Sequence, residues 1–250
     1  MTTVGIWLMG VGIADLVAGL SGEPARGTRS GFAIAAAFVS SLALALVFGL
    51  DVASSLLLAV VTGGSAVGWI VTRSRDGLSE GRATVALLYF LLVFVAIAGT
   101  AFLWPTATES VASRGIARLP FARLAGASSE LAALVCGVLL FLFATSNAIV
   151  RLVLTAVGTK FSPAEQRLRG GRIIGPIERL LIFGLGLAGE PTAAALVISA
   201  KGLLRYPELA GMRSEPGSSA RAIDLVTEYL LIGSLTSWTL ALLPLVLVSG

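Results

Sequence analysis

The chain has 250 residues, 56% of them hydrophobic and only 13% charged, with a mean hydropathy of +0.93 and a formal net charge of +4. A soluble domain carries charge on about a quarter of its residues, so these values exclude that class and indicate an integral membrane protein. The absence of histidine and the single cysteine, Cys136, exclude intrachain disulfides, thiolate metal cages and histidine-based nucleophile pairs. We therefore expect no metal or other cofactor, and most membrane hydrolases are ruled out.

Hydrophobic runs of membrane-spanning length recur along the chain and predict an all-α, polytopic transmembrane helical bundle of about eight spans, in a single integral membrane domain over residues 1–250. The first run has no basic leader and contains Asp15, which favours a retained span over a cleaved signal peptide. The expected spans are 4–20, 31–50, 52–72, 83–104, 131–158, 173–188, 191–206 and 222–248. At roughly 16 residues, or 24 Å, the sixth and seventh are short and need polar ends or burial by neighbours.

Basic residues are distributed unevenly over the loops between these spans. The side that receives the first, third, fifth and seventh loops is the richer one, and the other side has basic residues only in the fourth loop. Because cytoplasmic loops are enriched in Lys and Arg, this places both termini on the non-cytoplasmic side. The basic residues of the richer side are Arg26, Arg29, Arg73, Arg75, Arg82, Lys160, Arg167, Arg169, Arg172, Arg205, Arg213 and Arg221.

The fourth loop, at 105–130, separates the first four spans (1–104) from the last four (131–250). It combines apolar residues with Arg114, Arg118 and Arg123, which is typical of a helix lying in the membrane interface. Pro120 interrupts this pattern, which favours a plain interfacial connector. A lid, or a contact with anionic lipid, is the functional alternative.

Ionisable residues of both signs lie inside or at the edges of the last three spans. An ion in hydrocarbon costs about 2.5 to 3.5 kcal/mol, so such a set suggests mutual pairing and a functional reason to keep it. The predicted orientation brings these residues, with three polar residues of earlier spans, into one layer near the cytoplasmic side. The candidate residues of a substrate or ion pathway are Glu178, Arg179, Lys201, Arg205, Asp224, Glu228, Asp15, Asn147 and Arg151.

The same charges also have a purely structural interpretation. If Pro176 begins its helix, Glu178 lies in the first turn, where a carboxylate meets the positive end of the helix dipole. The acids of the last span lie near a helix start and the bases of the seventh span near a helix end, so every sign is favourable. Structural ion pairing therefore stays open beside a transport role.

Three segments of the second half are similar to an uncharacterised family of bacterial multi-pass inner-membrane proteins. The segments are 174–182 (IGPIERLLI), 200–206 (AKGLLRY) and 228–235 (EYLLIGSL), within roughly the last 100 residues. The family pattern has Gly-x-Leu-Glu-Arg, Ala-Lys-Ser with a following Arg-Phe, and Glu-Tyr-x-x-Ile-Gly-Thr. The chain departs from it at Ile177, Gly202, Tyr206 and Ser234.

This resemblance implies a location in the bacterial inner (plasma) membrane, with several spans, but carries no known activity. It singles out five of the ionisable residues already selected by their position in apolar segments. These are Glu178, Arg179, Lys201, Arg205 and Glu228.

Two short motifs resemble parts of membrane enzymes, and each is incomplete. Asp76, Gly77 and Arg82 resemble part of the alcohol phosphatidyltransferase motif, but the later aspartates that hold the metals are missing. The run at 26–31 (RGTRSG) resembles the phosphate-binding loop of undecaprenyl pyrophosphate phosphatases, without the paired glutamates of an early span. A lipid or polyprenyl phosphate-processing enzyme is a minor alternative, and no residue is assigned a catalytic role.

A transporter or channel-like protein for a small ion or small anionic solute is the function that the sequence favours. Short spans interrupted by glycine resemble the broken elements of transporter binding sites, and a carboxylate among basic residues can exchange a proton or a small ion. Glu178 and Glu228 are the candidate carboxylates, with Arg179, Lys201 and Arg205 as counter-charges.

The alternative from a different class is a non-catalytic membrane scaffold or partner subunit. Such a protein would use the charges only to set helix register, and it could form a homo-oligomer through faces of small residues. The lipid bilayer is the expected partner in either case. Nucleic acid is not expected, because the net charge of +4 is explained by the loops.

Overall fold

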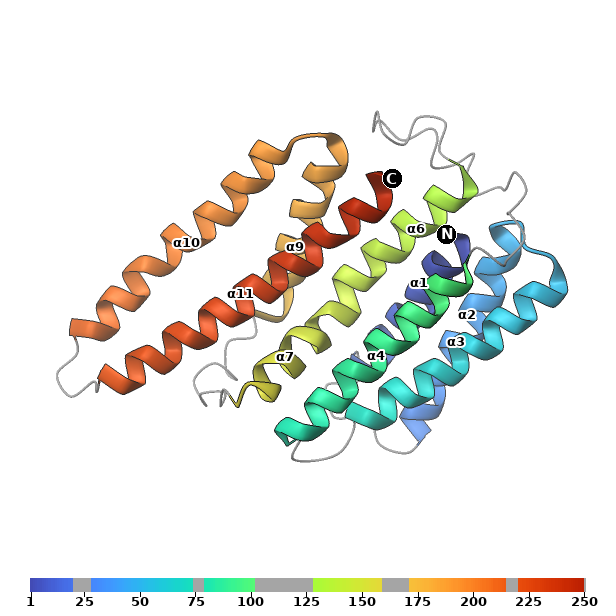
Figure 1. Ribbon diagram of the computed structural model, residues 1–250, viewed down its shortest axis with the longest axis horizontal. Coiled ribbons are helices and arrows are strands. Elements are labelled where there is room, and N and C mark those ends of the chain that lie inside the picture. Colours follow the sequence, from blue (N-terminus) through green and yellow to red (C-terminus); the bar gives the residue numbers. More distant parts are fainter. Residues whose placement is uncertain (20–27, 74–78, 102–127, 159–170, 215–219, 250) are drawn as a thin grey trace.

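The computed structural model describes residues 1–19, 28–73, 79–101, 128–158, 171–214 and 220–249, and all regular secondary structure in these ranges is helical (Figure 1). The predicted all-α class is therefore confirmed for the described part of the chain. The interfacial helix expected at 105–130 lies almost entirely outside it. In chain order the elements are α1 (Thr2–Gly19), α2 (Thr28–Val47), α3 (Val52–Arg73), α4 (Glu80–Thr100), α6 (Ser129–Leu140), the π-helical turn η2 (Phe141–Thr145), α7 (Ser146–Ala156), α9 (Gly171–Ala188), α10 (Pro191–Ser214) and α11 (Ala220–Ser249).

Six helical segments of the described chain are long and apolar enough to cross a membrane. They are Thr2–Gly19, Ser30–Val47, Val52–Arg73, Glu80–Thr100, Ser129–Ala156 and Thr227–Val248, where the fifth runs through α6, η2 and α7. Both termini lie at the same end of the bundle in Figure 1. These features support the predicted membrane class, while the count of eight spans and the side that faces the cytoplasm stay predictions.

The helix boundaries differ from the expected spans mainly in the second half. Helix α10 has 24 residues and ends at Ser214, so it is not the short span that was predicted to end at residue 206. Hydropathy detects its apolar part, Pro191–Leu203, but a helix can continue into a polar sequence. Helix α9 begins at Gly171, which puts Pro176 inside it and Glu178 beyond the first turn. The predicted interaction of Glu178 with the start of its helix is therefore wrong.

Helix α1 is the centre of the first half and packs against α2, α3, α4, α6 and η2. Of its apolar window, 72% is buried, compared with 17% for α4, as expected for a helix that is hydrophobic on all sides. Small residues allow the closest approach: a Cβ at Gly5 would overlap the backbone of Ala133, and one at Gly137 would overlap Gly5. The contact between α1 and α6 is thus a close backbone packing of the kind found in lipid.

An aromatic group joins α1 to its neighbours and extends toward the second half. The Phe90 ring lies 5.3 Å from Trp7, 5.0 Å from Trp69 and 6.0 Å from Phe141, measured between centroids. The same hydrophobic cluster includes Phe183 of α9. The apolar core therefore continues from the N-terminal helices through η2 to α9.

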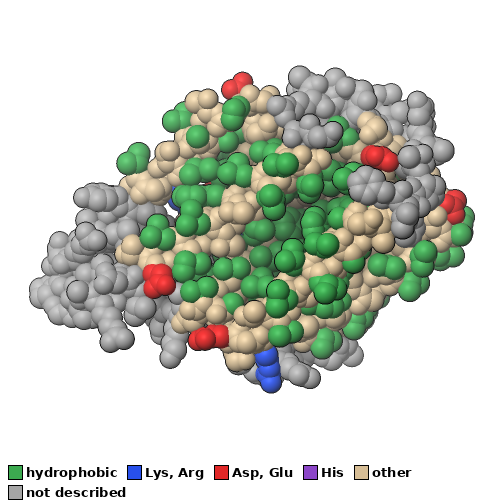
Figure 2. Space-filling view, viewed as in Figure 1, with side chains coloured by type: hydrophobic (Ala, Val, Ile, Leu, Met, Phe, Trp, Pro, Cys, Tyr) green, Lys and Arg blue, Asp and Glu red, His purple; other side chains and the backbone are tan. Residues whose placement is uncertain are grey.

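Large apolar side chains cover the outside of the bundle (Figure 2). On α4 alone the exposed residues include Val85, Leu88, Leu91, Leu92 and Val95. A soluble monomer rarely exposes a contiguous apolar surface of more than a few hundred Å². Together with the six apolar helices, this exposed apolar surface is typical of a membrane protein.

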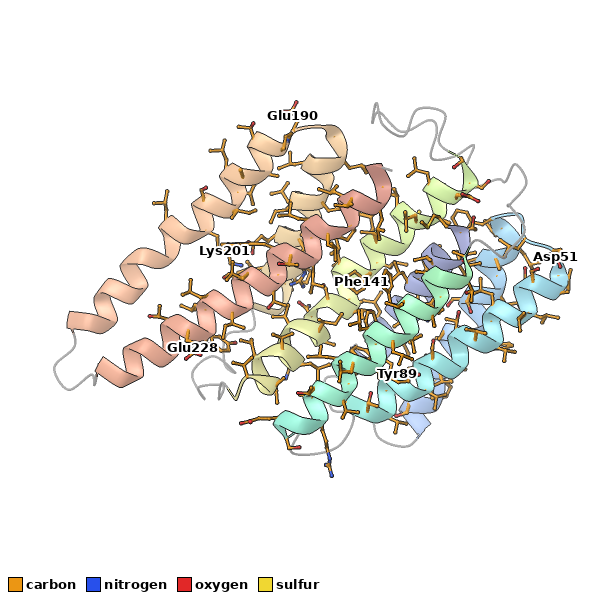
Figure 3. All side chains as sticks on the ribbon, in the orientation of Figure 1. Asp51, Tyr89, Phe141, Glu190, Lys201 and Glu228 are labelled. Atoms are coloured by element: carbon orange, nitrogen blue, oxygen red, sulfur yellow. The ribbon has the colours of Figure 1, made fainter. Side chains whose placement is uncertain are left out.

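The last three helices form a group of their own beside the N-terminal bundle (Figure 1). Helix α9 packs against α10, α11, α7 and η2, whereas α10 packs chiefly against α9 and α11 and lies at the edge of the molecule. Glu190 marks the turn between α9 and α10 in Figure 3. Helix α10 is therefore the least enclosed element of this group.

Candidate functional site

The carboxylate of Glu178 is the centre of a buried polar cluster formed by α9, α10 and α11. Its Oε2 lies 2.5 Å from Lys201 Nζ of α10, and its Oε1 accepts a hydrogen bond of 2.9 Å from Trp238 Nε1 of α11. Glu178 is only 8% exposed. We name these three residues the Glu178 cluster. Both oxygens of the carboxylate are thus engaged, by donors from two different helices.

Lys201 is the more accessible member of this cluster. Its ammonium lies 5.9 Å from the centroid of the Trp238 ring, and its side chain is 23% exposed. Figure 3 labels Lys201 between α10 and α11. The ion pair is therefore buried on the carboxylate side and open on the ammonium side.

Arg179, the next residue of α9, is 2% exposed and is held by three partners. Its Nε donates to Leu142 O at 3.3 Å, one terminal nitrogen donates to Ser237 Oγ at 3.0 Å, and the other donates to Asn147 Oδ1. The π turn makes Leu142 O available as an acceptor. In this turn the Ser146 N–H donates to Phe141 O, five residues earlier, and Leu142 O accepts hydrogen bonds from side chains instead. Arg179 therefore joins α9 to the segment formed by η2 and α7, and to α11.

The Glu178 cluster lies near the middle of its helices. Glu178 is ten residues before Ala188, Lys201 ten residues after Pro191, and Trp238 ten residues before Val248. At a rise of 1.5 Å per residue, each of the three residues is roughly 15 Å along its helix from Ala188, Pro191 or Val248. This distance is about half the thickness of a hydrocarbon core. Along α9 and α10, Glu178 and Lys201 thus lie about half-way between the helix ends, and their predicted position near the cytoplasmic side stays a prediction.

A second cluster of the same composition lies in the first half, at the end of α1. Both oxygens of Asp15 accept from Trp69 Nε1, at 3.3 and 3.1 Å, and Asp15 forms an ion pair with Arg73. The Arg73 guanidinium also lies 4.9 Å from the centroid of the Trp69 ring. We name these three residues the Asp15 cluster. Since Asp15 is four residues before Gly19, this cluster is close to a helix end, unlike the Glu178 cluster.

The other predicted site residues are not part of these clusters. Glu228 and Arg151 are exposed, on α11 and α7. Arg205 and Asp224 belong to α10 and α11, but their side chains lie outside the described part of the structure. Among the described residues these charges form two clusters, with Asn147 bound to Arg179 near one of them, and the single charged layer expected from the sequence stays a prediction.

Sequence reasoning missed the residues that complete both clusters. Trp69 and Arg73 have the i,i+4 spacing of one helix face, and this signal could have selected them as partners of Asp15. Trp238 and Ser237 gave no comparable signal, because they lie in an apolar span without a charged neighbour. Among the described residues, no group of three or more Cys, Asp or Glu side chains is arranged to hold a metal ion.

In the described part of the chain, the fold is all-α, with six helices apolar enough to cross a membrane and two buried ion pairs. The sequence matches no protein-family model, no curated protein and no solved structure. The chemistry available at the Glu178 cluster is the exchange of a proton or of an ionic partner on a carboxylate.

Proposed function

We propose that this chain is a membrane transport protein for a small ion or small anionic solute, and that the Glu178 cluster is its exchange site. The observation that carries the proposal is the buried ion pair between Glu178 and Lys201, half-way along α9 and α10, with the ammonium partly exposed. This position is where a transported ion has to be held between the two sides of a membrane.

The energetics of buried ions support a functional reason for this pair. Removing two charges from water costs several kcal/mol per ion, and apolar residues of similar volume are often at least as stabilising. Stability alone therefore does not account for Glu178 and Lys201 at this depth. Ionisable groups inside membrane spans commonly belong to ion or substrate pathways.

The contacts suggest different roles for the two cations beside Glu178. Arg179 has three hydrogen-bonding partners on two other helices, so we assign it the role of a fixed anchor. Lys201 is on the peripheral helix α10, is partly exposed and has a flexible aliphatic stem. We assign to Lys201 the role of the cation that exchanges partners.

The same proposal includes the finer points of topology and location. Helices α9 and α10 are two further crossings, which completes eight spans with both termini on the non-cytoplasmic side. The resemblance of the second half to bacterial inner-membrane proteins supports that membrane as the location. The distribution of Lys and Arg over the loops supports the orientation.

The test is ion flux in reconstituted vesicles. With an imposed pH gradient and a pH-sensitive dye inside, we expect Glu178→Gln to abolish proton-coupled flux while the protein stays folded. The matched control is Glu228→Gln, which removes an exposed carboxylate of α11 and should leave flux unchanged. Unchanged flux in Glu178→Gln would remove Glu178 from the mechanism.

A scaffold role is the second candidate, and it is favoured by the complete pairing of Glu178 and the three bonds of Arg179. A scaffold needs the charges only as partners of each other. It should therefore tolerate Glu178→Gln together with Lys201→Met better than either change alone. A transport protein should lose flux in all three variants.

A further inference from the structure

We infer that the transported solute is a small monocarboxylate, which replaces the Glu178 carboxylate on Lys201 and Trp238 and moves together with one proton. This inference rests on the proposed function and names its substrate class. It is based on the donor geometry of the Glu178 cluster and on the apolar residues around Trp238.

The two donors form a receptor for a carboxylate. One carboxylate oxygen receives the indole N–H of Trp238 at 2.9 Å, and the other receives the ammonium of Lys201 at 2.5 Å. An indole N–H and an ammonium can only donate, so neither group can bind a cation. A cationic solute would find the Glu178 oxygens already engaged and would face Lys201 and the adjacent Arg179. The site therefore favours an anion, and a carboxylate reproduces the two-oxygen geometry that these donors already hold.

In the structure this receptor is occupied by the side chain of α9 itself. A solute carboxylate can bind only when Glu178 moves off its donors, and a bare carboxylate in an apolar interior is costly. One proton on Glu178 removes that cost, because the neutral acid needs no cation. The net charge of the site is then the same before and after binding, since one proton and one anion enter together.

Among the side chains that the structure describes, the other charged groups near Glu178 are either held by other partners or exposed. Arg179 is directed to Leu142 O, Ser237 and Asn147. Of the remaining charged side chains described on α7, α10 and α11, Glu228 and Arg151 are exposed. Glu228 is ten residues from Trp238, roughly 15 Å along the helix. Lys201 is thus the cation that faces both Glu178 and the incoming anion.

The surroundings of Trp238 determine what the rest of the solute can be. The cluster against which Trp238 packs is apolar and contains small side chains. Its members are Ile182, Ala194, Ala241, Leu185, Val197 and Ile198. A hydroxyl or amino substituent that lies among these aliphatic side chains would be left unsatisfied. A short aliphatic chain on the carboxylate is the substituent that fits.

The experiment measures equilibrium binding of acetate to the purified full-length protein in detergent, from about pH 6 to about pH 8. Because one proton accompanies each anion, we expect the apparent Kd of the wild-type protein to rise by about tenfold per pH unit across this range. Sodium chloride and sodium gluconate, at the same concentration, serve as the inorganic and the hydroxylated arm. Both are expected to bind at least about tenfold more weakly than acetate.

The variants separate the roles of the three residues. Glu178→Gln should bind acetate with a Kd that no longer depends on pH, because the competing carboxylate is gone. Lys201→Met should lose binding, and Lys201→Arg should retain it, which shows that the loss does not come from misfolding. Trp238→Phe should bind several-fold more weakly. The matched control is Asp15→Asn, which alters the chemically similar Asp15 cluster and should leave the Kd unchanged.

Three results would overturn the inference: no acetate binding by the wild type, an unchanged pH slope in Glu178→Gln, or unchanged binding in Lys201→Met. None of them contradicts the proposed function, which depends on proton-coupled flux and its loss in Glu178→Gln. Conversely, pH-dependent acetate binding without any flux would support a carboxylate receptor and contradict transport.

Discussion

Replacing Lys201 with methionine removes the cation that neutralises the buried carboxylate of Glu178. The ion pair has a distance of 2.5 Å, and the carboxylate is 8% exposed. In the single variant, Trp238 is the one donor described on that carboxylate. Breaking a buried pair from one side typically costs about 3 to 5 kcal/mol. We expect a loss of about 3 kcal/mol in the free energy of unfolding, at the low end because Lys201 is partly exposed in the native state.

Glu178→Gln should cost a similar amount, since it leaves the Lys201 ammonium without its counter-charge. Two independent losses would add to about 6 kcal/mol, but the double variant leaves no unpaired charge and should lose less than either single variant, about 2 kcal/mol. The non-additivity of about 4 kcal/mol therefore measures the interaction between Glu178 and Lys201.

Unfolding in mixed micelles, followed by far-ultraviolet circular dichroism, measures all four proteins of this cycle. The control cycle replaces Glu178→Gln by Glu228→Gln, and it should be additive because Glu228 is exposed and far along α11 from Trp238. Additive losses for the Glu178 and Lys201 changes would refute the reasoning, because they would mean that the two charges do not neutralise each other.

Three further predictions address packing, anchoring and acid sensitivity. Gly5→Leu should lower the free energy of unfolding by more than about 3 kcal/mol, because its side chain meets the backbone of α6, whereas Gly64→Leu, which faces open space, should change the melting temperature little. Arg179→Lys should cost about 2 kcal/mol in chemical unfolding, since an ammonium cannot reproduce the planar fork that reaches three partners. The pKa of Asp51 is lowered by the hydrogen bond from the backbone N–H of Ser54, so its contribution is complete above the ordinary carboxyl pKa and is lost as pH falls through the lowered value. Asp51→Ala should therefore flatten the acid limb of a plot of melting temperature against pH, and an unchanged limb would contradict that assignment.

The helices of the first half could be predicted well because each is an apolar run of membrane length. The start of α3 at Val52 is set by Asp51, whose carboxylate accepts a hydrogen bond from Ser54 N–H, and the sequence shows this acidic residue directly before the apolar run. Helix α10 was harder, because its C-terminal part is helical without being apolar. Hydropathy reports where a chain prefers lipid, and a helix does not need lipid to continue.

The charged residues could be selected from the sequence, but their pairing could not. Burial cost identifies Glu178 and Lys201 as unusual, while their contact depends on how far α9 and α10 are displaced along their axes. Hydrophobic packing sets that displacement, and residue counts from predicted ends do not resolve it. The role of Trp238 as a donor could not be predicted for a related reason. In an apolar span an indole is expected to be a hydrophobic side chain, and only the contact with the Glu178 carboxylate shows that its N–H donates a hydrogen bond.

The position of α1 imposes an order on biosynthesis. Its glycine face closes on α6, a segment that leaves the ribosome only after α2, α3 and α4 have been made. Until then the first helix lies in the bilayer without this partner, and its largely apolar surface keeps that arrangement favourable. The helix that is synthesised first is thus enclosed late. A nascent chain arrested before Ser129 would expose the glycine face of α1 to the quality-control machinery of its membrane.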